Sequence, residues 1–172
     1  KKHLLPEPDL GERLARLKAE APENSFRAST TGTINNIVIF IRFLEQSEYT
    51  TPVSVYDTMC NSTSQESMRG YFLEDSNNQL TVNAGFCPAP VGGIVRSFQD
   101  GHNRAYFSPY NAITNPIGYD GLAEGRARMH SMFRTAVNTV GSSGTAGINV
   151  DGDNDGFVDN VIFVMQGDPD PQ

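Results

Sequence analysis

One short apolar segment constrains the fold of this chain more than any other feature. Residues 36–43 read Asn-Ile-Val-Ile-Phe-Ile-Arg-Phe, so β-branched and aromatic side chains dominate them. A strand with one face in water alternates apolar and polar residues, whereas a strand covered on both faces is apolar almost throughout. The segment therefore predicts a central strand with packed layers on both sides.

The rest of the chain alternates predicted helices and strands, judged from apolar residues at helical spacing and from strand-like alternation. The expected elements are a short helix between Asp9 and Pro22, a polar loop through Cys60, a helix that Ser64 caps and that ends near residues 76–78, strands over 79–86 and 104–107, the longest helix over 122–140, and a buried strand over 160–165. This order favours an α/β or α+β fold with a mixed sheet built on the two apolar strands.

Length and composition predict one domain with a short segment at each end. The chain has 172 residues, of which 38% are hydrophobic, enough for one core and too few for two ordinary domains. We expect residues 33–167 to form the domain, residues 1–32 an N-terminal helix and linker, and residues 168–172 a tail. Because the chain starts without Met or a signal-like apolar region, we interpret it as a processed or recombinant piece of a longer protein.

The charge balance excludes two classes of partner. The formal net charge is −7, and Lys and Arg form no cluster along the sequence. Nucleic acid and anionic membrane surfaces are therefore poor partners. The longest apolar runs, residues 37–41 and 161–165, are far shorter than the roughly 20 residues that a membrane span needs. We expect a soluble protein that binds neither nucleic acid nor membranes.

The two cysteines are evidence about the cellular compartment of the protein. Cys60 and Cys87 are an even count, which fits a single disulfide that closes the segment between them. Such a bridge is typical of an extracytoplasmic protein, either secreted or periplasmic. The alternative is a pair of buried free thiols.

An aspartate-rich loop precedes the last predicted strand. Residues 151–159 read Asp-Gly-Asp-Asn-Asp-Gly-Phe-Val-Asp, and carboxylates at every second position can wrap a hard cation in oxygen ligands. Gly156 permits the tight turn that directs the next carbonyl inward. The expected calcium ligands are the carboxylates of Asp151, Asp153 and Asp155, the carbonyl oxygen of Phe157, and Asp159 directly or through water. The alternative is a turn rich in Asp and Asn that holds no ion.

This loop differs from an EF-hand. The twelfth position, where an EF-hand carries a bidentate Glu, is Ile162, and it lies within an apolar run. A strand thus takes the place of the exiting helix. We expect the calcium ion to brace the loop instead of acting on a substrate.

The order of these motifs resembles the N-terminal half of the secreted immune inhibitor A family of zinc metallopeptidases. The resemblance covers roughly residues 33–167. It rests on the strand at 36–43, the segment Ser-Met-Arg-Gly-Tyr-Phe-Leu-Glu-Asp-Ser-Asn-Asn-Gln-Leu at 67–80, the long helix, and the aspartate loop that continues into Asn160 and a strand. It implies a zincin-like N-terminal subdomain, a twisted sheet with two main helices and a calcium loop. Residues 1–32 would then be a propeptide remnant.

The family's catalytic motif is missing from the sequence. That motif, His-Glu-x-x-His, places two histidines one helical turn apart to hold zinc, with the Glu as general base. The histidines here are His3, His102 and His130, and none has a His four residues away. We expect His102 to lie in a solvated turn and His130 to be an ordinary helix residue. The resemblance implies a fragment of a metalloendopeptidase that is inactive alone, with zinc only if a missing C-terminal segment supplies the ligands.

Two functions from different classes stay open. The first is the calcium-stabilised scaffold of such a peptidase, whose partner is the missing catalytic half or a peptide or protein substrate. The second is a stand-alone extracellular calcium-binding module for protein or polysaccharide recognition, with Tyr106, Phe107 and Tyr110 as its surface. An apolar surface left uncovered favours the first, and a well-covered compact domain favours the second.

Overall fold

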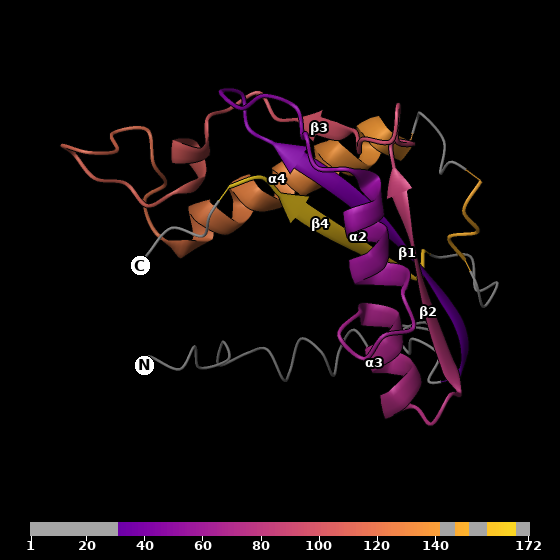
Figure 1. Cartoon of the computed structure of the whole chain (residues 1–172). Coiled ribbons are helices and arrows are strands. Elements are labelled where there is room, and N and C mark those ends of the chain that lie inside the picture. Colours follow the sequence, from indigo (N-terminus) through magenta and orange to yellow (C-terminus); the bar gives the residue numbers. More distant parts are fainter. Residues whose placement is uncertain (1–30, 142–146, 152–157, 168–172) are drawn as a thin grey trace, which may run out of the picture.

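The computed structural model describes residues 31–141, 147–151 and 158–167 (Figure 1). In chain order the elements are β1 (Gly32–Arg42), α2 (Val53–Asn61), α3 (Met68–Asp75), β2 (Leu80–Cys87), β3 (Ser97–Gln99), the 3-10 helix η1 (Arg104–Phe107), α4 (Leu122–Gly141) and β4 (Asn160–Met165). The helix expected between Asp9 and Pro22 lies outside the described residues. None of the helices in the described ranges is long and apolar enough to cross a membrane.

The sheet is built around β1. Strand β2 runs parallel to β1 along residues 32–39, and β3 runs parallel to it along residues 40–42. Strand β4 is also parallel and pairs with residues 36–41, so it occupies the opposite edge. The expected mixed sheet is therefore wrong for the four named strands. Helices lie in the connections that return the chain to β1, and such crossovers produce parallel neighbours.

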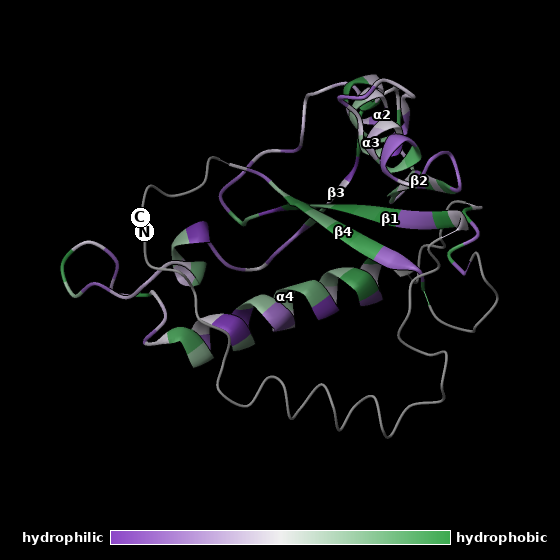
Figure 2. Ribbon diagram, turned by 90° about the horizontal axis from the view of Figure 1, so that it is seen from below, coloured by the Kyte–Doolittle hydropathy of each residue, from purple (hydrophilic) through white to green (hydrophobic). Residues whose placement is uncertain are grey.

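The expected central strand is confirmed by its burial. Alternate residues of β1 point to opposite faces. Ile37, Ile39 and Ile41 pack with Met132, Ala136 and Val140 of α4, whereas Val38 and Phe40 pack with Tyr49, Phe86 and Val95. Helix α4 lies on one face of the sheet and helices α2 and α3 on the other (Figure 2). Two layers thus cover β1, which explains why no polar residue interrupts its middle.

The helix expected at Ser64 begins later, after Ser67. The Ser67 Oγ atom accepts a hydrogen bond from Gly70 N at 3.0 Å, as an N-cap residue does. Ser64 instead forms a preceding turn, in which its carbonyl accepts a hydrogen bond from Ser67 N. Asn77 and Asn78 follow α3 with φ of 52° and 61°, which Asn tolerates better than most residues.

Helix α2 was not expected, because the sequence there predicts a polar loop. Val53, Tyr56 and Cys60 recur at helical spacing and pack on the sheet, while polar residues separate them. Three apolar side chains are enough to pack a short helix against the sheet, but too few to give the sequence a clear helical hydrophobic pattern.

The strand expected over residues 104–107 is also wrong, because these residues form η1. The strand in this region is β3, which contains only three residues. It pairs with residues 40–42 of β1, on the same side of β1 as β2, whose own pairing ends at Ile39. The strands expected over 79–86 and 160–165 and the helix over 122–140 are confirmed as β2, β4 and α4. Strand β4 is half-buried instead of buried.

The expected disulfide is wrong, because neither cysteine forms one. Cys87 ends β2 and belongs to the core on the α4 side of the sheet, whereas Cys60 packs from α2 on the opposite side. The sheet separates the two thiols. Burial raises the pKa of both, which keeps them protonated.

Candidate functional site

The aspartate loop is described at its two ends. Asp151 and Asp159 are half-buried, whereas Asp153, Asp155 and Phe157 lie outside the described residues. Asp159 N donates to Val150 O at 2.8 Å, which joins the two ends of the loop. The Asp159 Oδ2 atom accepts a hydrogen bond from Asn35 N at 2.9 Å. The base of the loop is thus closed and tied to β1.

A second polar pair fixes the start of β4. The Asn160 side-chain amide donates to Asn36 Oδ1 at 2.8 Å, and Asn36 is buried in β1. A buried amide needs a hydrogen-bond partner, and Asn160 supplies one. The aspartate loop therefore leads into a strand whose first residue is held against the central strand.

The residue types of this loop determine which kind of ion would suit it. The loop offers carboxylate and carbonyl oxygen atoms, which are the ligands that calcium prefers. The hydrogen bond between Asp159 N and Val150 O already brings the two ends of the loop together. The loop therefore loses less conformational entropy if it wraps an ion. The described ranges contain no cluster of three or more His, Cys, Asp or Glu side chains able to hold a metal. Within those ranges, His102 and His130 form no zinc site.

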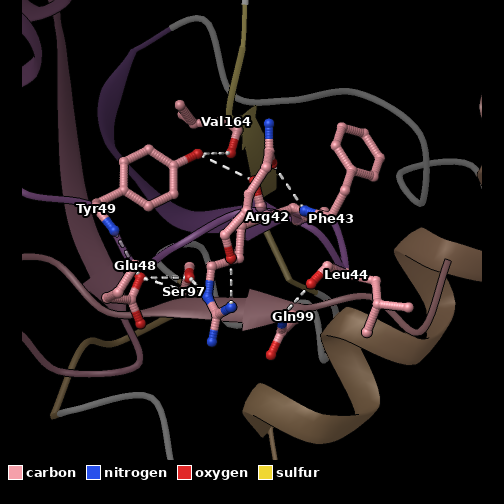
Figure 3. A network of polar contacts seen from close by, with 10 residues as sticks. Arg42, Phe43, Leu44, Glu48, Tyr49, Ser97, Gln99 and Val164 are labelled. Atoms are coloured by element: carbon pink, nitrogen blue, oxygen red, sulfur yellow. Dashed lines mark hydrogen bonds and ion pairs between the residues drawn. The ribbon is translucent and has the colours of Figure 1, made fainter. Parts of the chain in front are cut away.

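A polar network lies at the other end of β4 (Figure 3). The Tyr49 hydroxyl lies 3.0 Å from the carbonyl oxygens of both Ile41 and Val164, to which it donates. The Gln46 side chain accepts from Phe43 N at 2.8 Å and donates to Gln166 O at 3.2 Å. Two side chains of one loop thus fasten the carboxyl ends of β1 and β4 together.

The same network holds β3. Arg42 Nε donates to Ser97 Oγ at 3.1 Å, and Ser97 Oγ donates to Glu48 Oε1 at 2.5 Å. Burial alone would raise the pKa of Glu48, but hydrogen bonds from Ser97 and Tyr49 and the charge of Arg42 lower it overall. Burial raises the pKa of Tyr49, so its hydroxyl stays a donor at neutral pH.

Replacing Tyr49 with Phe tests whether these hydrogen bonds stabilise the carboxyl ends of β1 and β4. Tyr49→Phe removes only the hydroxyl and leaves a carbonyl oxygen without its donor, so we expect stability to fall by about 1–2 kcal/mol. Urea denaturation measures the change. Tyr110→Phe is the matched control, because the Tyr110 side chain is exposed, and its effect should stay within about 0.5 kcal/mol. Equal losses of stability in the two variants would contradict a stabilising role for the Tyr49 hydroxyl.

His102 is an exposed turn residue, as the sequence predicts, and it also pairs with a buried carboxylate. It lies in the turn after β3, where Asp100 N extends the pairing with β1 through Arg42 O at 2.9 Å. Asp100 is buried, and its Oδ1 atom accepts from His102 N at 2.8 Å and lies 2.8 Å from His102 Nδ1. The pattern Asp-x-His was the available signal for this pair, and it is too short to be distinctive. His130 is exposed on α4, as expected.

The aromatic surface expected from Tyr106, Phe107 and Tyr110 is not continuous. Tyr106 stacks on His102 at 4.1 Å between ring centres, and Phe107 packs against Phe43 at 5.5 Å. Both are half-buried, so their main contribution is to packing. Tyr110 alone is exposed.

The fold and these sites together define an open, parallel α/β domain that has an oxygen-rich loop at the amino end of β4 and a histidine–aspartate pair at the carboxyl end of β3. Comparison of the chain with protein-family models, with curated proteins and with solved structures found no match. The resemblance to the immune inhibitor A family thus depends on the chain's own residues.

Proposed function

We propose that this chain is the calcium-stabilised scaffold of a secreted zinc metallopeptidase of the immune inhibitor A type. The calcium ligands are Asp151, Asp153, Asp155, Phe157 and Asp159. The chain is not catalytic by itself, and zinc binds only where a further C-terminal segment supplies the ligands. The fold in this proposal is the N-terminal subdomain of a zincin.

The observation that carries the proposal is the open edge of β4. In the described part of the chain, β4 pairs with β1 alone. Its four inner side chains, Val161 to Val164, are only half-buried, and Met165 is 42% exposed. An edge of this kind presents unpaired backbone groups beside apolar side chains. A catalytic half that docks there would pair the edge and bury those side chains.

A buried polar atom beside the same edge also supports the proposal. Gln166 Oε1 is enclosed by protein without a hydrogen-bond partner among the described residues. Such an atom costs stability unless it is paired. A donor from a further segment would satisfy it.

The calcium loop supports a place outside the cytoplasm. Extracellular calcium is plentiful enough to fill a site of modest affinity. The partners in this proposal are the catalytic half or a peptide or protein substrate. The acidic charge argues against nucleic acid and anionic membranes.

One observation favours the alternative, a stand-alone extracellular calcium-binding module that recognises a protein or polysaccharide. The loop between η1 and α4 exposes Ile113 by 91% and Ile117 by 50%. Its backbone is held by Asn115, whose side-chain amide donates to Ala105 O and Pro109 O at 2.9 Å each. A loop held in this way, with apolar side chains outward, can bind a partner without first having to be ordered.

The coding sequence beyond Gln172 tests the proposal. We expect the natural reading frame to continue into a His-Glu-x-x-His motif, and the longer protein to cleave casein in a zinc-dependent manner. A stop codon at this point, or a longer protein without the motif, would overturn the peptidase proposal and leave the binding module.

A further inference from the structure

An open groove lies where the loop between η1 and α4 meets the first turn of α4 (Figure 1). Its volume is about 360 Å³, and the residues that line it are Pro109, Tyr110, Tyr119, Asp120, Gly121 and Leu122. Two of the large side chains among them are well exposed, Tyr110 by 51% and Leu122 by 66%. Large apolar side chains that are exposed together often mark an interaction surface.

The backbone around this groove is held in place before any partner binds. Tyr110 N donates to Tyr119 O at 2.9 Å, and Tyr119 N donates to Ser108 O at 3.0 Å. The two ends of the loop therefore lie side by side. The ring of Tyr119 packs on Gly125 of α4, where an added Cβ atom would come within 3.0 Å of the ring. A groove with a fixed backbone loses little conformational entropy when it binds a ligand.

The groove carries one charge that nothing nearby matches. Asp120 is the only charged residue among those that line it, and its carboxylate has no hydrogen bond or ion pair within the described residues. Arg128 is already engaged, because it pairs with Glu124 at 2.7 Å and donates to the carbonyl oxygens of Tyr106 and Ile117 at 2.6 and 3.0 Å. The groove thus keeps a negative charge beside its apolar side chains.

This combination of a carboxylate and an exposed aromatic ring indicates which side chain fits the groove. A guanidinium group pairs with a carboxylate through two parallel hydrogen bonds and also stacks on aromatic faces, which makes arginine a better match than lysine. The chain contains such an arrangement already, since the Arg128 Cζ atom lies 3.7 Å from the centre of the Tyr106 ring while its guanidinium pairs with Glu124. The net charge of −7 also favours a basic partner.

We propose that this groove binds a peptide segment that contains an arginine next to an aliphatic residue. The guanidinium group lies between Asp120 and the ring of Tyr110, and the aliphatic side chain packs on Leu122. The proposal names a partner for the loop of the binding-module alternative. It does not depend on the peptidase scaffold, because neither the aspartate loop nor the edge of β4 lines the groove, so either proposal can fail alone.

Nuclear magnetic resonance of the backbone amides tests this proposal on the full 172-residue chain. The ligands are acetyl-leucyl-arginine amide and acetyl-leucyl-citrulline amide, which have the same shape and differ in the charge of the side chain. We expect the arginine peptide to shift the amide signals of Tyr119 and Gly121 saturably in the millimolar range, with an affinity about fivefold higher than that of the citrulline peptide. Asp120→Asn should remove this difference and leave the affinity for the citrulline peptide unchanged.

Asp75→Asn is the matched control, because Asp75 is exposed at the end of α3 and its replacement removes the same charge. It should keep the preference for arginine. Equal affinities for the two peptides in the wild type, an equal loss of preference in Asp75→Asn, or no response at all would overturn the proposal. So would a response of the same amides to cellotetraose without a response to the arginine peptide, which would assign the groove to a polysaccharide. The amide spectrum of each variant confirms that it is folded.

Discussion

Calcium is expected to raise the melting temperature of this protein, and Asp155→Ala is expected to abolish the rise. An ion that binds only the folded chain stabilises it by about 4 kcal/mol at a thousandfold excess over its dissociation constant. For a domain of this size that corresponds to roughly 10 °C. Without the ion, the carboxylates of residues 151–159 repel one another, so the variant in chelator should melt close to the wild type.

Asp75→Ala is the matched control for this experiment. Asp75 ends α3 on the surface, far in sequence from the loop, and its loss removes the same charge. We expect it to keep the full response to calcium. Calorimetric melting in calcium and in chelator measures all three proteins. A wild-type melting temperature indifferent to both would contradict a calcium loop, and an equal loss of response in Asp75→Ala would indicate a general charge effect.

Gly70→Ala is expected to destabilise the protein by about 3 kcal/mol, which combines overpacking with the loss of a helix cap. Gly70 is buried in α3, and a Cβ atom there would overlap the carbonyl oxygen of Ser64. The turn that contains Ser64 would have to move. Because that turn positions Ser67, the hydrogen bond from Gly70 N to Ser67 Oγ would weaken with it.

Gly101→Ala is the control for Gly70→Ala. No atom lies within 4 Å of the position that its Cβ would take, and its φ is not in the left-handed region. We expect a change within about 0.5 kcal/mol. Urea denaturation of both variants measures the difference. A Gly70→Ala protein as stable as the wild type would show that the turn adapts and that the close contact does not constrain α3.

The elements that could be predicted are those whose signal is local. Strand β1 is apolar over residues 37–41 because α4 covers one face of the sheet there and α2 and α3 cover the other. Helix α4 has an apolar side long enough to give an unambiguous period. Strand β3 could not be predicted, because three residues carry no period and its pairing with β1 depends on where β2 ends.

The disulfide prediction failed for a related reason. Counting cysteines says nothing about which face of a sheet each one reaches, and Cys60 and Cys87 lie on opposite sides. The parallel direction of β4 was equally hidden, because it depends on a crossover through α4. Both properties arise from the tertiary arrangement.

The candidate sites differ in how far the sequence reveals them. The aspartate loop is visible because its candidate ligands are close together in the sequence, and the structure adds the hydrogen bond between Asp159 N and Val150 O. The pairing of Asp100 with His102 could not be predicted, because it depends on the stacking of His102 on Tyr106 and on the hydrogen bond of Asp100 N to β1. Sites formed by contiguous residues can be inferred early, and sites formed by packing cannot.

Equilibrium dialysis with radioactive calcium tests the central claim most directly. We expect one ion to bind each wild-type chain, the same stoichiometry in Asp75→Ala, and no specific binding in Asp155→Ala. Wild-type protein that binds no calcium, or an Asp155→Ala protein that binds it as well as the wild type does, would contradict the assignment of residues 151–159 as the calcium site.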